Sequence, residues 1–196
     1  MGIMMIMPLF NLIIYVVAAI AIVILGIAII IYNVLVALRN NVRKAWANID
    51  VLLEKRHDLI SRLVDVVKGY EKYERTVLVQ VTAMRTEWMQ IQNVPDVKAK
   101  MKTSNQISQA LKSLFADVEN YPDLKADRTF LELQQAITEM ENQIADRREF
   151  YNDTVNTYNI KIQIFPFVLF SSLLEYKPLP FFQPPAGSTD KINVIL

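Results

Sequence analysis

The stretch that decides the fold is LIIYVVAAIAIVILGIAIIIY, residues 12–32, which holds 21 consecutive residues without a charged side chain. An α-helix of this length spans about 30 Å, which is the thickness of the hydrocarbon core of a bilayer. Fourteen of the 21 residues are Leu, Ile or Val, which favour insertion into lipid. The stretch therefore predicts a transmembrane helix, preceded by a short exposed N-terminus over residues 1–11.

A cleaved signal peptide is the alternative interpretation of this segment. Such peptides combine a basic N-terminal region, an apolar core of about 7 to 15 residues and a cleavage site of small residues. Residues 1–11 contain no Lys or Arg, the apolar run is longer, and residues 29–32 read Ile-Ile-Ile-Tyr. These features favour an anchor that is not cleaved.

Basic side chains flank the anchor on one side only. No Lys or Arg precedes it, whereas Arg39, Arg43 and Lys44 follow it closely. By the positive-inside rule, this asymmetry predicts an N-terminus outside the cytoplasmic membrane and a C-terminal domain in the cytoplasm.

Beyond the anchor, a heptad pattern continues without Pro or a cluster of turn residues. At alternating steps of four and three from Val42 to Ile91, thirteen of fifteen positions are apolar or aromatic. A period of 3.5 residues is typical of a helix packed in a coiled coil or bundle. Gly69 interrupts the pattern, but a single Gly costs about 1 kcal/mol without necessarily breaking a helix. We therefore expect one helix from Leu12 to Ile91, which Pro95 ends.

Two further helices complete an all-α fold. The second covers about residues 97–120, and the third begins at Asp127 or Thr129 and ends near Gln163. A short apolar helix follows Pro166. The expected architecture is an up-and-down antiparallel bundle of three long helices plus the short C-terminal helix. We assign the bundle domain to residues 33–176 and a Pro-rich extended tail to residues 177–196.

Composition excludes several classes of function. Lys and Arg number 21 against 20 Asp and Glu, and the charges are interspersed, so the chain lacks the basic surface that nucleic acid requires. The absence of Cys removes disulfides and thiolate chemistry, and a single His excludes an ordinary Ser-His-Asp arrangement within one subunit. Glycine-rich phosphate-binding loops are also absent. We therefore predict no catalytic residues, no cofactor and no enzymatic activity.

One spacing typical of metal sites occurs, at Glu54 and His57. An E-x-x-H motif places both side chains on one helix face, as in di-iron helical bundles. Such sites need two of these motifs and two further carboxylates, and His57 is the only histidine in the sequence. Only a symmetric oligomer could assemble the ligands, so we interpret the motif as solvated helix surface and predict no metal site.

Charged residues occupy four positions of the apolar seams, namely Arg56 and Glu74 in the first helix and Glu141 and Arg148 in the third. A charge in an apolar seam is costly unless it is paired, and a pair can fix the register between helices. Arg56 could pair with Glu141, or Glu74 with Arg148. Alternatively, these side chains extend to solvent at the edge of the bundle.

The first helix also predicts a self-association face next to the membrane. Its part outside the membrane would be roughly 80 Å long, whereas the second helix would cover about 36 Å. The membrane-proximal face would then have no partner within the chain, so we expect it to pack against other copies and form a homo-oligomer. The residues of this predicted self-association face are Val42, Ala45, Trp46, Ile49, Leu52 and Leu53.

Short motifs spread through the chain point to a family. They include Leu38-Arg39-Asn40-Asn41-Val42, Ala45-Trp46-x-x-Ile49-Asp50-Val51, Arg56-His57-Asp58-Leu59-Ile60, Tyr121-Pro122-Asp123-Leu124-Lys125-Ala126 and Arg147-Arg148-x-Phe150-Tyr151-Asn152-Asp153. Together they resemble the LemA family of bacterial membrane proteins over about residues 32–182. The resemblance implies an N-terminal membrane helix, an α-helical and largely antiparallel bundle, and no established enzymatic activity or cofactor. Relatives include a protein of the magnetosome membrane, which suggests membrane organisation by analogy.

The sequence departs from the family pattern at three places. Ser61-Arg62 stands where Pro-Asn is common, which favours an uninterrupted first helix. Tyr73 stands where His is frequent. Glu175-Tyr176 replaces a Gly-aromatic pair, which bears on the conformation after Leu174.

The sequence therefore predicts a non-enzymatic structural protein of the bacterial inner membrane, whose partners are the lipid bilayer and other copies of itself, assembled as a scaffold. The alternative is an adaptor or regulator that presents the bundle to a membrane protein partner such as a protease or sensor. Nucleic acid is not expected as a partner.

The predicted orientation can be tested by protease digestion of intact spheroplasts. Because the C-terminal domain is expected in the cytoplasm, an epitope at its end should survive until the membrane is permeabilised. Loss of the epitope from intact spheroplasts would reverse the orientation.

Overall fold

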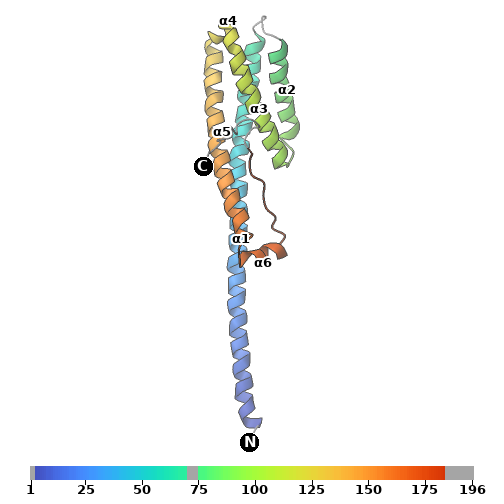
Figure 1. The fold of residues 1–196 in the computed structure, drawn as a ribbon, viewed down its shortest axis with the longest axis vertical. Helices are drawn as coiled ribbons and strands as arrows, with labels where there is room; N and C mark the ends of the chain where they lie inside the picture. Colours follow the sequence, from blue (N-terminus) through green and yellow to red (C-terminus); the bar gives the residue numbers. More distant parts are fainter. Residues whose placement is uncertain (1–2, 70–74, 184–196) are drawn as a thin grey trace, which may run out of the picture. The chain divides into compact units, whose positions relative to one another are not determined.

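The computed structural model describes residues 3–69 and 75–183 of the chain, and all regular secondary structure in these residues is helical (Figure 1). The elements are α1 (Ile3–Lys68), α2 (Arg75–Ile91), α3 (Val97–Asp117), the 3-10 helix η1 (Val118–Asn120), α4 (Pro122–Lys125), α5 (Arg128–Lys161) and α6 (Phe167–Leu173). The prediction of an all-α fold with a short C-terminal helix is confirmed.

Helix α1 carries the apolar anchor and continues into the amphipathic part of the chain without a break over its 66 residues. Within the described chain it is the one helix long and apolar enough to cross a membrane. Its most apolar 18-residue window has a mean hydropathy of 3.2, and none of that window is buried. The exposed apolar surface is what a lipid-facing helix requires.

The chain divides into two compact units. The anchor unit comprises residues 1–43 and 154–179, and the bundle unit comprises residues 44–153 and 180–196, of which the structure describes those up to 183. Helices α1 and α5 each contribute to both units.

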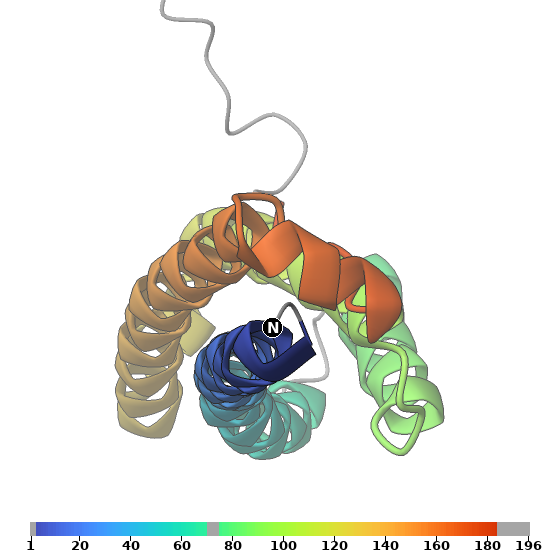
Figure 2. The ribbon, with the colours of Figure 1, turned by 90° about the horizontal axis from the view of Figure 1, so that it is seen from below.

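In the bundle unit, α1, α2, α3 and α5 run alternately up and down (Figure 1). Viewed from below, the other long helices form an arc around α1 (Figure 2). Helix α3 contacts α5 directly, because Ser108 bonds to Glu141 and Arg148 to Ser104. The buried side chains of the core recur at steps of three, four or seven on α1, α3 and α5, as expected for bundle packing, and α2 adds one described buried residue. They include Ile49, Leu53, Ile60 and Leu63 of α1, Trp88 of α2, Ile107, Leu111 and Leu114 of α3, and Phe130, Ile137 and Ile144 of α5.

The first predicted helix is in fact two helices. Helix α1 ends at Lys68, where the N–H of Gly69 donates to the carbonyl of Val66 at 3.1 Å, and α2 begins at Arg75 and runs back antiparallel (Figure 1). The prediction of one helix from residue 12 to residue 91 is therefore wrong. The 3.5-residue period of the sequence continues through this point, so the period alone could not reveal the break.

Two of the predicted helix starts are confirmed in detail. Asp96 caps α3, because its Oδ1 accepts from the N–H groups of Lys98 at 2.9 Å and Ala99 at 3.1 Å. Asp127 caps α5 by accepting from the N–H of Phe130 at 2.8 Å, so the earlier of the two expected starts is correct.

In the anchor unit, the last turns of α5 run beside α1, and α6 lies across the axis of α1 (Figures 1 and 2). From residue 11 of α1 onward, residues 11–30 are exposed or half-exposed, and Ile31 and Leu35 are the first buried side chains. The hydroxyl of Ser171 donates to the carbonyl of Ile162 at 2.6 Å and ties α6 to the end of α5.

A left-handed residue joins α6 to the segment that follows. Glu175 has a φ of 54° and is the one non-Gly residue with positive φ in the described chain. Gly adopts this conformation most easily, and the resemblance noted in the sequence implies a Gly at this position. The Glu175 backbone therefore has a geometry that suits Gly better than Glu.

Replacing Glu175 with Gly should stabilise the protein by about 1 kcal/mol, because a non-Gly residue in the left-handed region costs about 1 to 2 kcal/mol and the added flexibility of Gly offsets part of the gain. Thermal unfolding of the full chain in detergent measures the effect. The matched control is Lys177→Gly two residues away, which adds flexibility at a residue without positive φ and should lower the midpoint. An unchanged or lower midpoint for Glu175→Gly would show that the left-handed conformation is not costly here.

Candidate functional site

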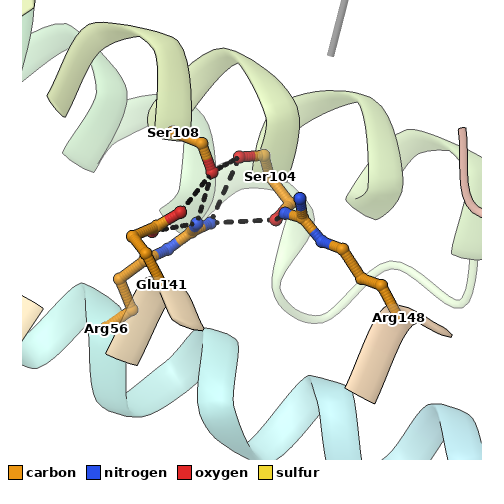
Figure 3. A network of polar contacts seen from close by, with 5 residues as sticks. All are labelled: Arg56, Ser104, Ser108, Glu141 and Arg148. Atoms are coloured by element: carbon orange, nitrogen blue, oxygen red, sulfur yellow. Dashed lines mark hydrogen bonds and ion pairs between the residues drawn. The ribbon is translucent and has the colours of Figure 1, made fainter. Parts of the chain in front are cut away.

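A fully buried arginine, Arg56, lies on the α1 seam of the bundle unit. Its Nη1 donates to Oε1 of Glu141 on α5 at 2.8 Å and to the hydroxyl of Ser108 on α3 at 3.1 Å (Figure 3). Its Nη2 donates to the hydroxyl of Ser104 at 3.1 Å. One guanidinium group therefore joins three helices, and its planar fork of donors suits this arrangement.

The two serines present their hydroxyls from consecutive turns of α3. Ser108 Oγ lies 2.6 Å from Oε2 of Glu141 and 3.0 Å from the carbonyl of Ser104. Because a hydroxyl has one proton, the shorter contact to the charged carboxylate is the favoured hydrogen bond. Ser104 Oγ accepts a second hydrogen bond, from Nη2 of Arg148 at 2.7 Å (Figure 3).

The network holds two cations and one anion. Burial lowers the pKa of Arg56, and the charge of Glu141 partly offsets the effect. Burial and, to a smaller extent, the nearby charge of Arg56 lower the pKa of Arg148 to about 10, although the charge of Glu141 acts in the opposite direction. Both groups remain cationic at neutral pH. The Arg148 guanidinium also lies 4.4 Å from the centre of the Phe182 ring, a cation–π contact that compensates part of its lost hydration.

A second ion pair joins α1 to α3 in the same unit. Nζ of Lys100 lies 2.8 Å from Oδ1 and 3.0 Å from Oδ2 of Asp50, and the lysine is buried. Neither residue was a predicted site residue. Ser104 lies three residues before the buried Ile107 and Lys100 four residues before Ser104, so helical spacing from Ile107 places both on the buried face of α3.

The predicted self-association face lies inside the chain. Val42, Ala45, Ile49 and Leu53 are each at most 4% exposed, and Leu52 is half-buried. The expectation that this face lacks a partner within its own chain is therefore wrong. The expectation failed because two features of the fold were not predicted. The first helix ends at Lys68 instead of continuing to residue 91, and the C-terminal segment returns to α1.

Trp46 shows how the chain covers this face within the bundle unit. Its ring meets that of Tyr151 on α5 edge-on at 5.8 Å and that of Phe182 at 6.3 Å. Phe182 is itself buried. These aromatic contacts place the C-terminal segment on the predicted self-association face.

Asparagine side chains on α5 bind the backbone of the C-terminal segment. In the bundle unit, Asn152 accepts from the N–H of Phe182 at 2.7 Å and donates to its carbonyl at 3.0 Å. In the anchor unit, Asn159 forms the same pair of hydrogen bonds with Leu179, at 2.8 and 2.9 Å. Each asparagine amide therefore pairs with both the N–H and the carbonyl of one residue, as a neighbouring β-strand would.

Two tyrosines add to this attachment, one in each unit. The hydroxyl of Tyr151 donates to the carbonyl of Pro180 at 3.2 Å, and that of Tyr158 donates to the carbonyl of Lys177 at 3.0 Å. Burial raises the pKa of Tyr151 to about 12 and also raises the pKa of Tyr158, so both remain protonated donors at neutral pH. Residues 177–183 form no helix or strand, and the rest of the predicted tail lies outside the described residues.

The family comparison decides the affiliation of the chain. The model of the LemA family matches residues 45–195, which is more than half of the sequence. The chain belongs to the LemA family. Its match begins where the bundle unit begins and includes the Arg56 network.

Curated LemA-family relatives resemble the chain over most of its length. Magnetosome protein MamQ 1 of Paramagnetospirillum magneticum is 25% identical over 185 residues, covering 82% of this chain and 68% of the relative. MamQ of Magnetospirillum gryphiswaldense is 22% identical over the same shares. Protein LemA of Metamycoplasma hominis is 25% identical over 162 residues, covering 83% of this chain and 72% of the relative. Family membership and the unburied apolar helix together indicate a membrane location.

The remaining predicted site residues have less structural support in this LemA-family chain. Glu74 lies outside the described residues, so its pairing with Arg148 stays a prediction. Among the described residues no group of three or more His, Cys, Asp or Glu gathers to hold a metal, and burial lowers the pKa of His57. The predicted topology determinants Arg39, Arg43 and Lys44 are exposed, and Arg39 lies 5.4 Å from the centre of the Tyr176 ring in the anchor unit.

The geometry predicts an asymmetric response to breaking the Arg56–Glu141 pair. Glu141→Gln leaves a fully buried guanidinium without its counter-charge, so it should destabilise the protein by about 3 kcal/mol. Arg56→Met should cost less, because the carboxylate is 26% exposed and can regain water. In the double variant, the added cost of Glu141→Gln should largely disappear. Chemical unfolding of the full chain in detergent measures all three.

The control is the exposed pair Arg128 and Glu132, whose side chains meet at 2.9 Å on the surface of α5. Glu132→Gln should change the stability little, since exposed ion pairs contribute little. Additive effects of Arg56→Met and Glu141→Gln would contradict a coupled pair.

Proposed function

We propose that this LemA-family chain is a non-enzymatic adaptor that α1 holds at the membrane and whose bundle presents a docking surface to a membrane protein partner. The observation that supports this proposal is an open groove between α3 and residues 180–183, with a volume of about 680 Å³. Its lining consists of Lys98, Met101, Lys102, Asn105, Gln106, Gln109, Pro180, Phe181 and Gln183.

The chemistry of the groove suits a protein segment. Lys98 and Lys102 supply positive charge, and Phe181 is an exposed ring at the opposite wall. Asn105 fixes that wall, because its amide donates to the carbonyl of Gln183 at 2.9 Å. The groove is therefore complementary to an extended segment that carries both acidic and apolar side chains.

The side chains of the bundle unit also support a role without catalysis. In the Arg56 network, the carboxylate and the serine hydroxyls are engaged with arginines, and neither cation can act as a base at neutral pH. The groove offers lysines and amides but no pair of nucleophile and base.

The scaffold of self-associated copies, which the sequence predicts as the leading function, is the second candidate. The face that motivated it is occupied by the chain itself, as the burial of Ile49 and Leu53 indicates. A scaffold would need another surface, whereas the adaptor uses one that is open. For this reason we favour the adaptor.

Photocrosslinking in native membranes distinguishes the two. A benzoylphenylalanine at Gln106 lies in the groove, and the same residue at Gln135, an exposed glutamine on α5, is the matched control. The adaptor predicts one dominant adduct with a different protein at Gln106 and far less of it at Gln135. A ladder of multiples of the chain would support the scaffold instead, and no adduct at Gln106 would contradict docking in this groove.

A further inference from the structure

An exposed apolar patch surrounds α6 in the anchor unit. Phe165 is 78% exposed, Leu169 61% and Leu173 79%. Ile164, Val168 and Leu174 are also exposed. Single exposed apolar residues are ordinary, but six within eleven positions form a contiguous patch that is costly in water.

Within the anchor unit, the patch lies where α5 has ended and α6 crosses α1. Helix α5 runs back along α1 toward the anchor and ends at Lys161, α6 then crosses α1, and the following segment turns away again (Figure 1). From residue 11 onward, Ile31 is the first buried residue of α1, and the predicted transmembrane segment ends at Tyr32. The packing of other protein segments against α1 therefore begins at the residue where its run of exposed apolar side chains ends.

The orientation of α6 fits a membrane surface. It lies across α1 in both views, so a bilayer crossed by α1 would have its plane along α6 (Figures 1 and 2). Ser171 holds α6 from the protein side through its hydrogen bond to the carbonyl of Ile162, and it is buried. The face of α6 that carries Ser171 is therefore held against the protein, and the exposed apolar side chains lie on the other faces of this helix.

Cationic groups border the patch. Nζ of Lys161 lies 4.3 Å from the centre of the Phe167 ring, and Lys177 is exposed just beyond α6. Cations beside aromatic and aliphatic side chains are typical of segments that lie among lipid headgroups.

We propose that Phe165 and α6 form an interfacial foot, which rests in the headgroup region of the same bilayer that α1 crosses and inserts Phe165, Leu169 and Leu173 among the outer acyl carbons. The occupant is lipid rather than a protein, because the patch continues the lipid-facing surface of α1 and is bordered by cations. Interfacial helices of this kind bury their apolar side by about 5 to 10 Å. This inference rests on the membrane anchoring by α1, and it is independent of the groove on α3.

Spin labelling tests the proposal directly, because the sequence contains no Cys and each labelled variant carries one probe. Leu169→Cys and Leu173→Cys are labelled in the full chain, which is reconstituted in vesicles of phosphatidylcholine and phosphatidylglycerol. Power-saturation EPR then compares collisions with oxygen, which concentrates in lipid, and with a water-soluble nickel chelate. We expect the ratio of oxygen to nickel collisions to be several-fold higher at both positions than at a Leu131→Cys control, a 46% exposed residue in the bundle unit.

An Ile22→Cys label, at a 70% exposed position of the anchor, reports separately whether α1 is inserted. Nickel collisions at Leu169 and Leu173 as frequent as at Leu131, with Ile22 in lipid, would overturn the proposed foot and leave the anchor intact. Low collision rates with both reagents at α6 would also overturn it, because they indicate a protein contact. A water-like signal at Ile22 would overturn the anchor and the foot together.

Discussion

A guanidinium group without access to water, that of Arg56, constrains how α1, α3 and α5 can pack in the bundle unit. Its donors reach Glu141 on one helix and Ser104 and Ser108 on another, so any shift of one helix along its neighbours would leave a buried charge without a partner. Apolar side chains tolerate such a shift better, because one aliphatic contact can replace another. The network therefore gives the bundle one register among several that hydrophobic packing would allow.

The C-terminal segment is attached by a different principle. Asn152 and Asn159 bind its peptide groups, whereas Phe182 alone is the buried side chain among the described residues of its bundle-unit part. Recognition of backbone specifies an extended conformation with little demand on side-chain identity. Because two of the residues in this segment are Pro, which have no N–H, it depends on such side-chain donors more than a regular strand would.

Most of the helical framework could be predicted from the sequence, because periodicity and capping residues act locally. The ranges of α3 and α5 and their starts at Asp96 and Asp127 follow from local sequence signals. The pairing of Arg56 with Glu141 was one of several arrangements that the sequence left open, because spacing along one helix does not give its height against another. The break after Lys68 could not be recognised, since the heptad pattern of the sequence continues through it. The contact between Phe182 and Trp46 was not predicted either, because no local sequence pattern specifies a contact between residues so far apart in the chain.

The contact of Phe182 with Trp46 also has a consequence for how the protein is made. During synthesis α1 leaves the ribosome well before the segment that carries Phe182. Until that segment has been made, the Trp46 ring of the nascent chain lacks this cover. A product truncated before Phe182 would therefore expose an aromatic surface that the longer chain covers.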